Sequence, residues 1–278
     1  MDFLCLCVYN KGKDFHFSEG MALKLHFLGT CSGTEPLVGR HHTSLAIETR
    51  GRLYFLDAGE SCSYSAHLLG LDLLATRAVF ISHTHMDHIG GLCNLIWTVR
   101  KLVRVTKRPA ETDVLRVYLP SAPVGQAIET LLDHSEGYLH ELCRAEMNPY
   151  AQGLVFDDGD LRVTAFPNTH VQPVDGNPVS YSFLVECEGR RVVYSGDVKR
   201  YDELDAAVGE GCDLLIGETG HHKIDDVYAY FRAKEVGRFC FIHHGREILN
   251  DPVGAEEKIG ALFGGRAALM NDGDVLEL

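Results

Sequence analysis

Short apolar runs alternate with amphipathic stretches along the chain, which is the pattern of a layered α/β fold. Runs rich in apolar and β-branched residues predict strands at Leu23–Leu28, Ser44–Glu48, Leu53–Leu56, Ala78–Ser82, Val114–Leu119, Leu161–Phe166, Ser182–Glu186, Arg191–Tyr194, Asp213–Ile216 and Phe239–Ile242. Helices are expected at Ala127–His134, Asp226–Phe231 and Ala255–Phe263, and a further segment, Ala66–Leu74, lies between two of the strands. Polar residues with metal-binding or catalytic chemistry recur where the strands end.

One further helix has a clear amphipathic pattern. Its apolar positions recur at intervals of three and four residues, at Leu92, Leu95, Ile96, Val99, Leu102 and Val103. Arg100, Lys101 and Arg104 are then expected to face outward. The basic cluster from Arg100 to Arg108 is either a solvated helix face or a local patch that attracts anions.

The length and composition fit a single globular domain, because the chain has 278 residues of which 45% are hydrophobic. We assign this domain to residues 21–278, and residues 1–20 to an edge hairpin or a peripheral extension. The first twenty residues lack a basic segment followed by an apolar one, which argues against a signal peptide. No run of about 18 apolar residues occurs, so no membrane span is expected.

The net charge limits the kinds of partner that the protein is expected to bind, and the cysteines indicate its cellular compartment. The formal net charge of −13 argues against a broad nucleic-acid-binding surface, but it leaves room for a small anionic substrate. The nine cysteines are irregularly spaced and odd in number, which predicts reduced thiols and a cytoplasmic location. Oligomeric state is not encoded in these patterns, and a homodimer is the commonest default.

The most informative segment is a polar loop directly after the apolar strand Ala78–Ser82. It brings four possible metal ligands together within six residues, namely His83, His85, Asp87 and His88. Imidazoles and carboxylates suit zinc, manganese and iron, and a tight loop at a strand end can direct several of them into one cavity. A polar turn has no need for this arrangement, so the loop indicates a hydrolase with two metal ions.

Three further polar residues follow apolar runs elsewhere in the chain. His170 comes shortly after Leu161–Phe166, Asp197 follows Arg191–Tyr194 and His243 follows Phe239–Ile242. Each one alone has an ordinary explanation, such as a satisfied core histidine or a turn aspartate. Together they supply the donors that the four residues of the loop need to complete two metal sites.

In the order of these motifs the chain resembles the metallo-β-lactamase superfamily: the HxHxDH loop at His83–His88, His170, Gly196-Asp197 and His243. The resemblance implies an α/β fold of four layers, an αββα sandwich with a dinuclear metal site at the edge between its two sheets. It assigns His83, His85 and His170 to one ion, Asp87, His88 and His243 to the other, and Asp197 to both. It also makes Asp57 a residue that supports the ligands without binding metal.

The turn Gly29–Thr34 is similar to the opening of the ribonuclease Z and phosphodiesterase branch of that superfamily, and so is Ile216-Gly217-Glu218-Thr219. Gly217 replaces a histidine of the tRNA-processing enzymes, and no long arm rich in glycine and proline is visible within Pro120–Gly153. The cyclic phosphate phosphodiesterases have a histidine three residues after the acidic residue, which is the spacing of Glu218 and His221. His221 is therefore the candidate general acid, with the adjacent His222 as its alternative.

The expected activity is cleavage of a small or cyclic phosphodiester, or of a short nucleotide, by a hydroxide that bridges two metal ions. Asp87 and His221 are the catalytic candidates, and Glu218 is expected to support them. Zinc is the first choice of metal, with manganese or iron as alternatives. The candidates for the substrate pocket are Ser32, His41, His42 and His222.

Three alternatives stay open at this point. The same scaffold can open a lactone or a thioester, it can cleave RNA as ribonuclease Z does, or it can sense a ligand without catalysis. His85 stands where the diiron oxygen and nitric-oxide reductases of the superfamily have a glutamate, and this difference favours hydrolysis over redox chemistry.

Overall fold

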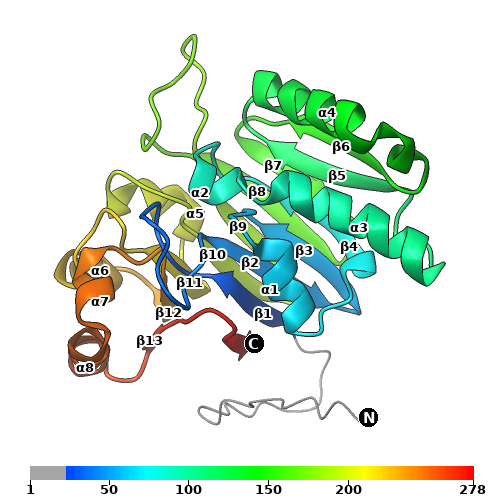
Figure 1. Cartoon of the computed structure of the whole chain (residues 1–278). Helices are drawn as coiled ribbons and strands as arrows, with labels where there is room; N and C mark the ends of the chain where they lie inside the picture. Colours follow the sequence, from blue (N-terminus) through cyan, green and yellow to red (C-terminus); the bar gives the residue numbers. More distant parts are fainter. Residues whose placement is uncertain (1–22) are drawn as a thin grey trace, which may run out of the picture.

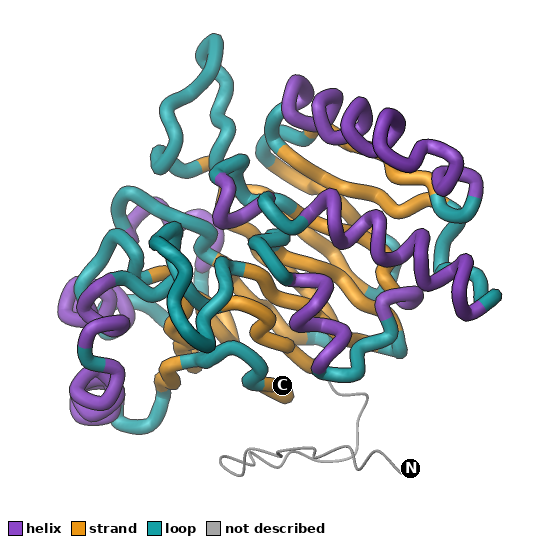
Figure 2. Tube along the Cα trace, viewed as in Figure 1, coloured by secondary structure: helices purple, strands orange, loops and turns teal. Residues whose placement is uncertain are grey.

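Two seven-stranded sheets pack face to face in the computed structural model, which describes residues 23–278 (Figures 1 and 2). The first sheet has the strand order β14 (Val275–Glu277), β1 (Lys24–Gly29), β2 (Ser44–Thr49), β3 (Arg52–Leu56), β4 (Thr76–Phe80), β5 (Val114–Leu119), β6 (Arg144–Pro149). The second has the order β13 (Ala267–Leu269), β12 (Val236–Ile242), β11 (Cys212–Glu218), β10 (Arg190–Tyr194), β9 (Tyr181–Cys187), β8 (Leu161–Pro167), β7 (Gly153–Asp157). The predicted extension at residues 1–20 lies outside the described residues.

Helices cover the outer face of each sheet and complete four layers (Figure 1). The helical elements between strands of the first sheet are α1 (Cys62–Leu68), η1 (Leu73–Ala75), α2 (Met86–Ile89), α3 (Leu92–Thr106), α4 (Ala122–Glu136) and η2 (Gly137–Glu141). Those associated with the second sheet are η3 (Tyr201–Leu204), α5 (Asp205–Val208), α6 (Ile224–Phe231), α7 (Arg246–Asn250) and α8 (Pro252–Phe263). The αββα fold predicted from the sequence is confirmed.

The continuous apolar runs arise because the central strands are buried on both faces. In β4, Ala78 and Phe80 point into the core between the two sheets, whereas Val79 points into the core beneath α1, α3 and α4. In β11, Leu214 and Leu215 divide in the same way between the inner core and the core beneath the second set of helices. Because neither face of these strands meets water, the sequence lacks the polar alternation of a half-exposed strand.

The strand directions bring the polar strand ends together. Strands β3 to β6 run parallel to one another, and so do β10 to β13. The carboxyl ends of parallel strands meet at one edge of a sheet, which is where ligand sites form in such folds. The turns after β4, β10, β11 and β12 therefore open into one region between the two sheets.

One expectation for α3 was wrong. Arg100 does not face outward: it is buried, and its Nε–H donates a hydrogen bond to the carbonyl of Cys143 at 2.9 Å. Lys101 and Arg108 do reach the surface, where they pair with Glu136 and Asp72. These two cations of the basic cluster thus have carboxylate partners on the protein, in keeping with a solvated helix face.

The seven cysteines within residues 23–278 are free thiols, as their spacing predicted. Among the helices of the same part of the chain, none is both long and apolar enough to cross a bilayer.

Candidate metal centre

The HxHxDH loop leaves the first sheet directly after β4 and turns into the short helix α2. His83 and His88 are buried, whereas His85 at the helix N-cap is exposed to the cavity described below. Gly33 from the turn after β1 packs against this loop, because a Cβ atom at its position would lie 2.8 Å from Oδ2 of Asp87. That close approach accounts for a glycine in the turn.

The second sheet contributes three more side chains from its strand ends. His170 follows β8, Asp197 follows β10 through the positive φ of Gly196, and His243 follows β12. His243 itself has a φ of 47°, a left-handed conformation that non-glycine residues seldom adopt and that is frequent at functional sites. Asp197 and His243 are almost completely buried.

The structure brings the seven predicted ligands into two adjacent groups. His83, His85 and His170 form the first group, and Asp87, His88, Asp197 and His243 form the second, with possible ligand atoms in each group within 4.8 Å of one another. In the first group, Nδ1 of His85 lies 3.0 Å from Nε2 of His83 and 3.2 Å from Nε2 of His170. In the second, Nε2 of His243 lies 3.1 Å from Oδ2 of Asp87.

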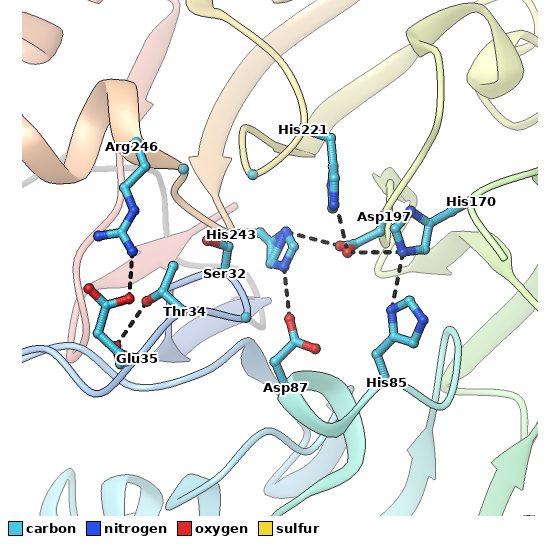
Figure 3. Close-up of a pocket in the computed structure, with 13 residues that line it drawn as sticks. Ser32, Thr34, Glu35, His85, Asp87, His170, Asp197, His221, His243 and Arg246 are labelled. Carbon is cyan, nitrogen blue, oxygen red and sulfur yellow. Dashed lines mark hydrogen bonds and ion pairs between the residues drawn. The ribbon is translucent and has the colours of Figure 1, made fainter.

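Asp197 lies between His170 of the first group and His243 of the second (Figure 3). Its two carboxylate oxygens face different groups. Its Oδ2 lies 3.6 Å from His170 and 3.9 Å from His83 of the first group. Its Oδ1 lies 3.0 Å from Nδ1 of His243 and 3.3 Å from Nε2 of His88 in the second group. A carboxylate in this position can contact two cations at once.

The polar atoms of the second group are better placed to bind a metal ion than to form hydrogen bonds with one another. Nε2 of His88, Oδ1 of Asp197 and Nδ1 of His243 are buried and close together, yet none has a hydrogen-bond partner among the described residues. Buried polar atoms are normally satisfied, so exceptions call for an explanation such as an ion. Imidazole nitrogens and a carboxylate oxygen directed at one point are the donors that Zn²⁺, Mn²⁺ and Fe²⁺ accept.

The pKa shifts of Asp197 and His83 also suit metal binding. Burial alone would raise the pKa of Asp197, but the neighbouring His243 and His88 hold that pKa well below its usual range. Burial lowers the pKa of His83 well below its usual value, which keeps its imidazole neutral. Metal ligands must be deprotonated, so the ionised Asp197 and the neutral His83 are ready to bind. Burial would lower the pKa of His88, but the carboxylates of Asp197 and Asp57 raise it well above its usual value, so a cation has to displace a proton from this residue.

Asp57, which follows β3, supports the loop from outside the two groups. It accepts hydrogen bonds of 2.7 Å from the backbone N–H and the hydroxyl of Ser82, and Nδ1 of His88 lies 2.7 Å from its Oδ2. The contact leaves Nε2 of His88 directed at the cluster. Asp57 thus contacts a predicted ligand and is not itself part of either group.

The two adjacent histidines after β11 differ in environment. His221 has a side chain that is 45% exposed, lines the cavity and places Nδ1 3.0 Å from Oε1 of Glu218. That hydrogen bond raises the pKa of His221 above its ordinary value. His222 points away: its Nε2–H donates to the carbonyl of Val198 at 2.9 Å, and its ring contacts Tyr201.

The cluster opens into a cavity of about 500 Å³ (Figure 3). The residues that line it come from both sheets: Ser32, Gly33, Thr34, Glu35, His85, Asp87, His170, Asp197, Gly220, His221, His243, Gly245 and Arg246. Of the predicted pocket residues, Ser32 is among them, and His41, His42 and His222 are not. His41 binds Asp272 and His42 binds the carbonyl of Thr34, so both rings hold the neighbouring loop together.

Sequence reasoning missed three polar residues of this cavity, Thr34, Glu35 and Arg246. Arg246 forms an ion pair with Glu35 at the far end of the cavity from His85 and His170 (Figure 3). It follows His243 by only three residues in the same strand-end turn, a spacing that could have suggested it. Thr34 ends the turn Gly29–Thr34 and Glu35 directly follows it, and no local pattern there separates cavity residues from surface residues.

Comparisons with known proteins agree with this architecture. A family model described as "Anti-Pycsar protein Apyc1" matches residues 23–232. A ribonuclease Z of Natronomonas pharaonis is 24% identical, over 93% of this chain and 98% of that protein. Among solved structures, the short form of human tRNase Z has a TM-score of 0.68 at 22% identity, covering 91% of this chain and 98% of its own.

The metallo-β-lactamase fold protein YhfI from Bacillus subtilis has a TM-score of 0.69 at 18% identity, and the match covers 93% of this chain and all of that one. The fold is thus common to proteins of low sequence identity, while the family model covers most of the described residues. The chain belongs to the Anti-Pycsar protein Apyc1 family, within the ribonuclease Z and phosphodiesterase branch of metallo-β-lactamase-fold hydrolases.

Proposed function

We propose that the protein is a phosphodiesterase with two divalent cations that hydrolyses a small or cyclic phosphodiester or a short nucleotide. The observation that carries this proposal is the position of Asp197, whose two oxygens face separate groups of ligands. His83, His85 and His170 would hold one ion, Asp87, His88 and His243 the other, and Asp197 would contact both. Zinc is our first choice, with manganese or iron as alternatives.

When bound, two such ions supply hydroxide near neutral pH and neutralise charge on the phosphoryl oxygens. The chain's own residues orient the substrate and move the proton. In the reaction an oxygen from water adds to phosphorus, the bond from phosphorus to the leaving oxygen breaks, and that oxygen must gain a proton. His221 is placed to donate it, because it lines the cavity and Glu218 occupies its Nδ1, which leaves Nε2 as the ring nitrogen that can give up a proton.

One cationic side chain in the cavity wall could bind a further anionic group of the substrate, beyond the phosphate at the cluster. Arg246 is the one arginine or lysine among the residues that line it, and its partner Glu35 lies at the surface. Exposed ion pairs of this kind contribute little to stability, so the guanidinium can turn to an anion at small cost. This supports a substrate with a phosphate at the cluster and a further acceptor group toward Arg246.

Ribonuclease Z-like cleavage of RNA is the second candidate, and the relative from Natronomonas pharaonis supports it through its name and its coverage. The net charge of −13 favours the smaller substrate, because RNA binding rests on basic surfaces that contact many phosphates. A cytoplasmic location and a homodimer stay predictions from the sequence.

The test combines metal analysis with a substrate panel. The purified protein is analysed for metals, each metal is restored separately, and bis-p-nitrophenyl phosphate, cyclic nucleotides, a lactone, a thioester and a structured RNA are compared as substrates. We expect Asp197→Ala to lose both metal and phosphodiester cleavage, whereas Asp202→Ala, which changes an exposed carboxylate, keeps both. An Asp197→Ala protein with full metal content and wild-type cleavage would disprove the assignment.

A further inference from the structure

Tyr194, the last residue of β10, forms a hydrogen bond between the two sheets. Its hydroxyl lies 2.6 Å from Oδ2 of Asp57, which follows β3 in the first sheet. The ring is completely buried, and burial raises the pKa of the phenol well above its usual value. The hydroxyl therefore keeps its proton and acts as the donor to an acceptor that belongs to the opposite sheet.

Asp57 connects this phenol with the HxHxDH loop. Its Oδ1 accepts the N–H of Ser82, and its Oδ2 contacts the Ser82 hydroxyl, Nδ1 of His88 and the Tyr194 hydroxyl. Every one of these contacts is 2.7 Å or shorter. A carboxylate held by so many donors has a fixed orientation. Its contact with Nδ1 of His88 then fixes the orientation of that imidazole ring.

The same tyrosine also lies three residues before Asp197. The turn between them packs tightly on the first sheet, because a Cβ atom on Gly196 would lie 3.0 Å from Cβ of Ser82. Tyr194 thus lies beneath the contact between two turns, one carrying His88 and the other carrying Asp197. Its hydroxyl contacts Asp57, which in turn contacts His88, and its strand leads into the turn that carries Asp197.

We infer that Tyr194 is a positioning residue, which sets His88 through Asp57 and aligns the ligand loop of one sheet with Asp197 of the other. The inference rests on the proposed function only in requiring that the cluster binds metal. Groups that orient metal ligands from behind typically contribute ~10- to 100-fold to metal affinity. Tyr194 is expected to contribute in this way without touching metal or substrate.

Tyr194→Phe tests the inference, because it removes the hydroxyl and keeps the ring that stacks on Phe183. Tyr54→Phe is the matched control. Tyr54 is equally buried and donates a 2.8 Å hydrogen bond to Asp158, which is not among the residues of the cluster or of its cavity. Both variants lose a hydrogen bond from a buried tyrosine to a carboxylate, so a purely structural role would give both a similar result.

The measurement is the dissociation constant for Zn²⁺ alone, by competition with a chromophoric chelator and without substrate. We expect Tyr194→Phe to raise the dissociation constant of the more affected Zn²⁺ ion by ~10-fold or more. Tyr54→Phe should change it by less than about twofold. If Tyr194 acts through Asp57, adding Tyr194→Phe to Asp57→Asn changes the affinity by less than about twofold.

Wild-type affinity in Tyr194→Phe, or an equal loss in Tyr54→Phe, would overturn the inference. So would a Tyr194→Phe protein that fails to fold while Tyr54→Phe folds, because the phenol would then be required for the fold itself. Failure of the proposed function looks different: the wild-type protein would bind Zn²⁺ and cleave no phosphodiester, and the effect of Tyr194 on metal affinity would still be measurable.

Discussion

At the scale of the residue, His221 and His222 show how neighbouring identical side chains come to lie in different environments. The hydrogen bond to Glu218 holds His221 in the cavity wall, and the bond to the carbonyl of Val198 turns His222 away from it. Sequence alone offered both as proton donors, since they share a residue type and a position after β11. Only the direction of the two rings separates them, and that direction depends on contacts from distant parts of the chain.

A prediction follows for the proton donor. His221→Ala should lower kcat by ~10²–10⁴ for a phosphodiester with an alkyl leaving group, which needs a proton as it departs. Bis-p-nitrophenyl phosphate has a stable phenolate leaving group, so its kcat should fall much less. Steady-state kinetics on both substrates measure the difference, with His222→Ala expected to keep the wild-type ratio. An equal loss on both substrates would show that His221 does not supply the proton.

At the scale of the element, one carboxylate from the far end of the chain, that of Asp272, contacts both ends of the loop from Thr30 to His42. Oδ1 of Asp272 accepts the N–H and the hydroxyl of Thr30, at 2.9 and 2.7 Å. Its Oδ2 accepts the N–H of His41 at 2.6 Å and lies 2.9 Å from Nδ1 of the same residue. Both ends of the loop are therefore held at a single point, and the loop between them carries Ser32, Thr34 and Glu35 of the cavity.

Asp272→Ala should release this loop while leaving the metal content unchanged. If the loop then occupies its present position only about a tenth to a third of the time, KM rises roughly 3- to 10-fold. Hydrogen exchange over residues 30–42 should become faster in parallel. Asp274→Ala serves as the control, because this neighbouring carboxylate accepts from Asn271 and not from the loop. Unchanged exchange in Asp272→Ala would show that other contacts hold the loop.

Most elements could be predicted because the central strands are apolar on both faces, and the amphipathic stripe of α3 is equally clear. The strands that escaped prediction, β6, β7, β13 and β14, are partly exposed and so lack such a pattern, and β13 and β14 have only three residues each. The helix expected at Ala127–His134 extends over Ala122–Glu136, because a proline in the first turn is compatible with a helix.

The candidate metal site was easier to predict than its surroundings. Each of its seven side chains follows an apolar run, and the order of the motifs supplied their grouping. Asp272 and Tyr194 had no comparable signal, since a turn aspartate and a strand tyrosine are ordinary in sequence. Their importance depends on which partners the packing of the two sheets brings to them.

At the scale of the whole molecule, the cluster joins the two sheets, because His83, His85, Asp87 and His88 come from the first and His170, Asp197 and His243 from the second. Ligands that bind only the folded state stabilise it by mass action, by ~2.7 kcal/mol at a free concentration one hundred times Kd. Metal bound at this cluster would oppose the separation of the two sheets as well as local unfolding near the ligands.

Removal of metal should therefore lower the melting temperature of the wild-type protein by about 5–10 °C, the shift that such a stabilisation gives in a domain of this size. Calorimetry before and after treatment with a strong chelator measures it. Asp197→Ala should melt at the same temperature in both conditions, because it has lost the side chain that faces both groups. A wild-type protein with no response to the chelator would show that metal is not bound there under those conditions.

The position of His243 late in the chain has a consequence for biosynthesis. The first four side chains of the cluster leave the ribosome early, but the second group is completed only after β12 has been made and has paired with β11. A nascent polypeptide that stops before this strand carries an incomplete set of donors. Metal held by both groups could thus be bound tightly only after nearly the whole sandwich has been synthesised.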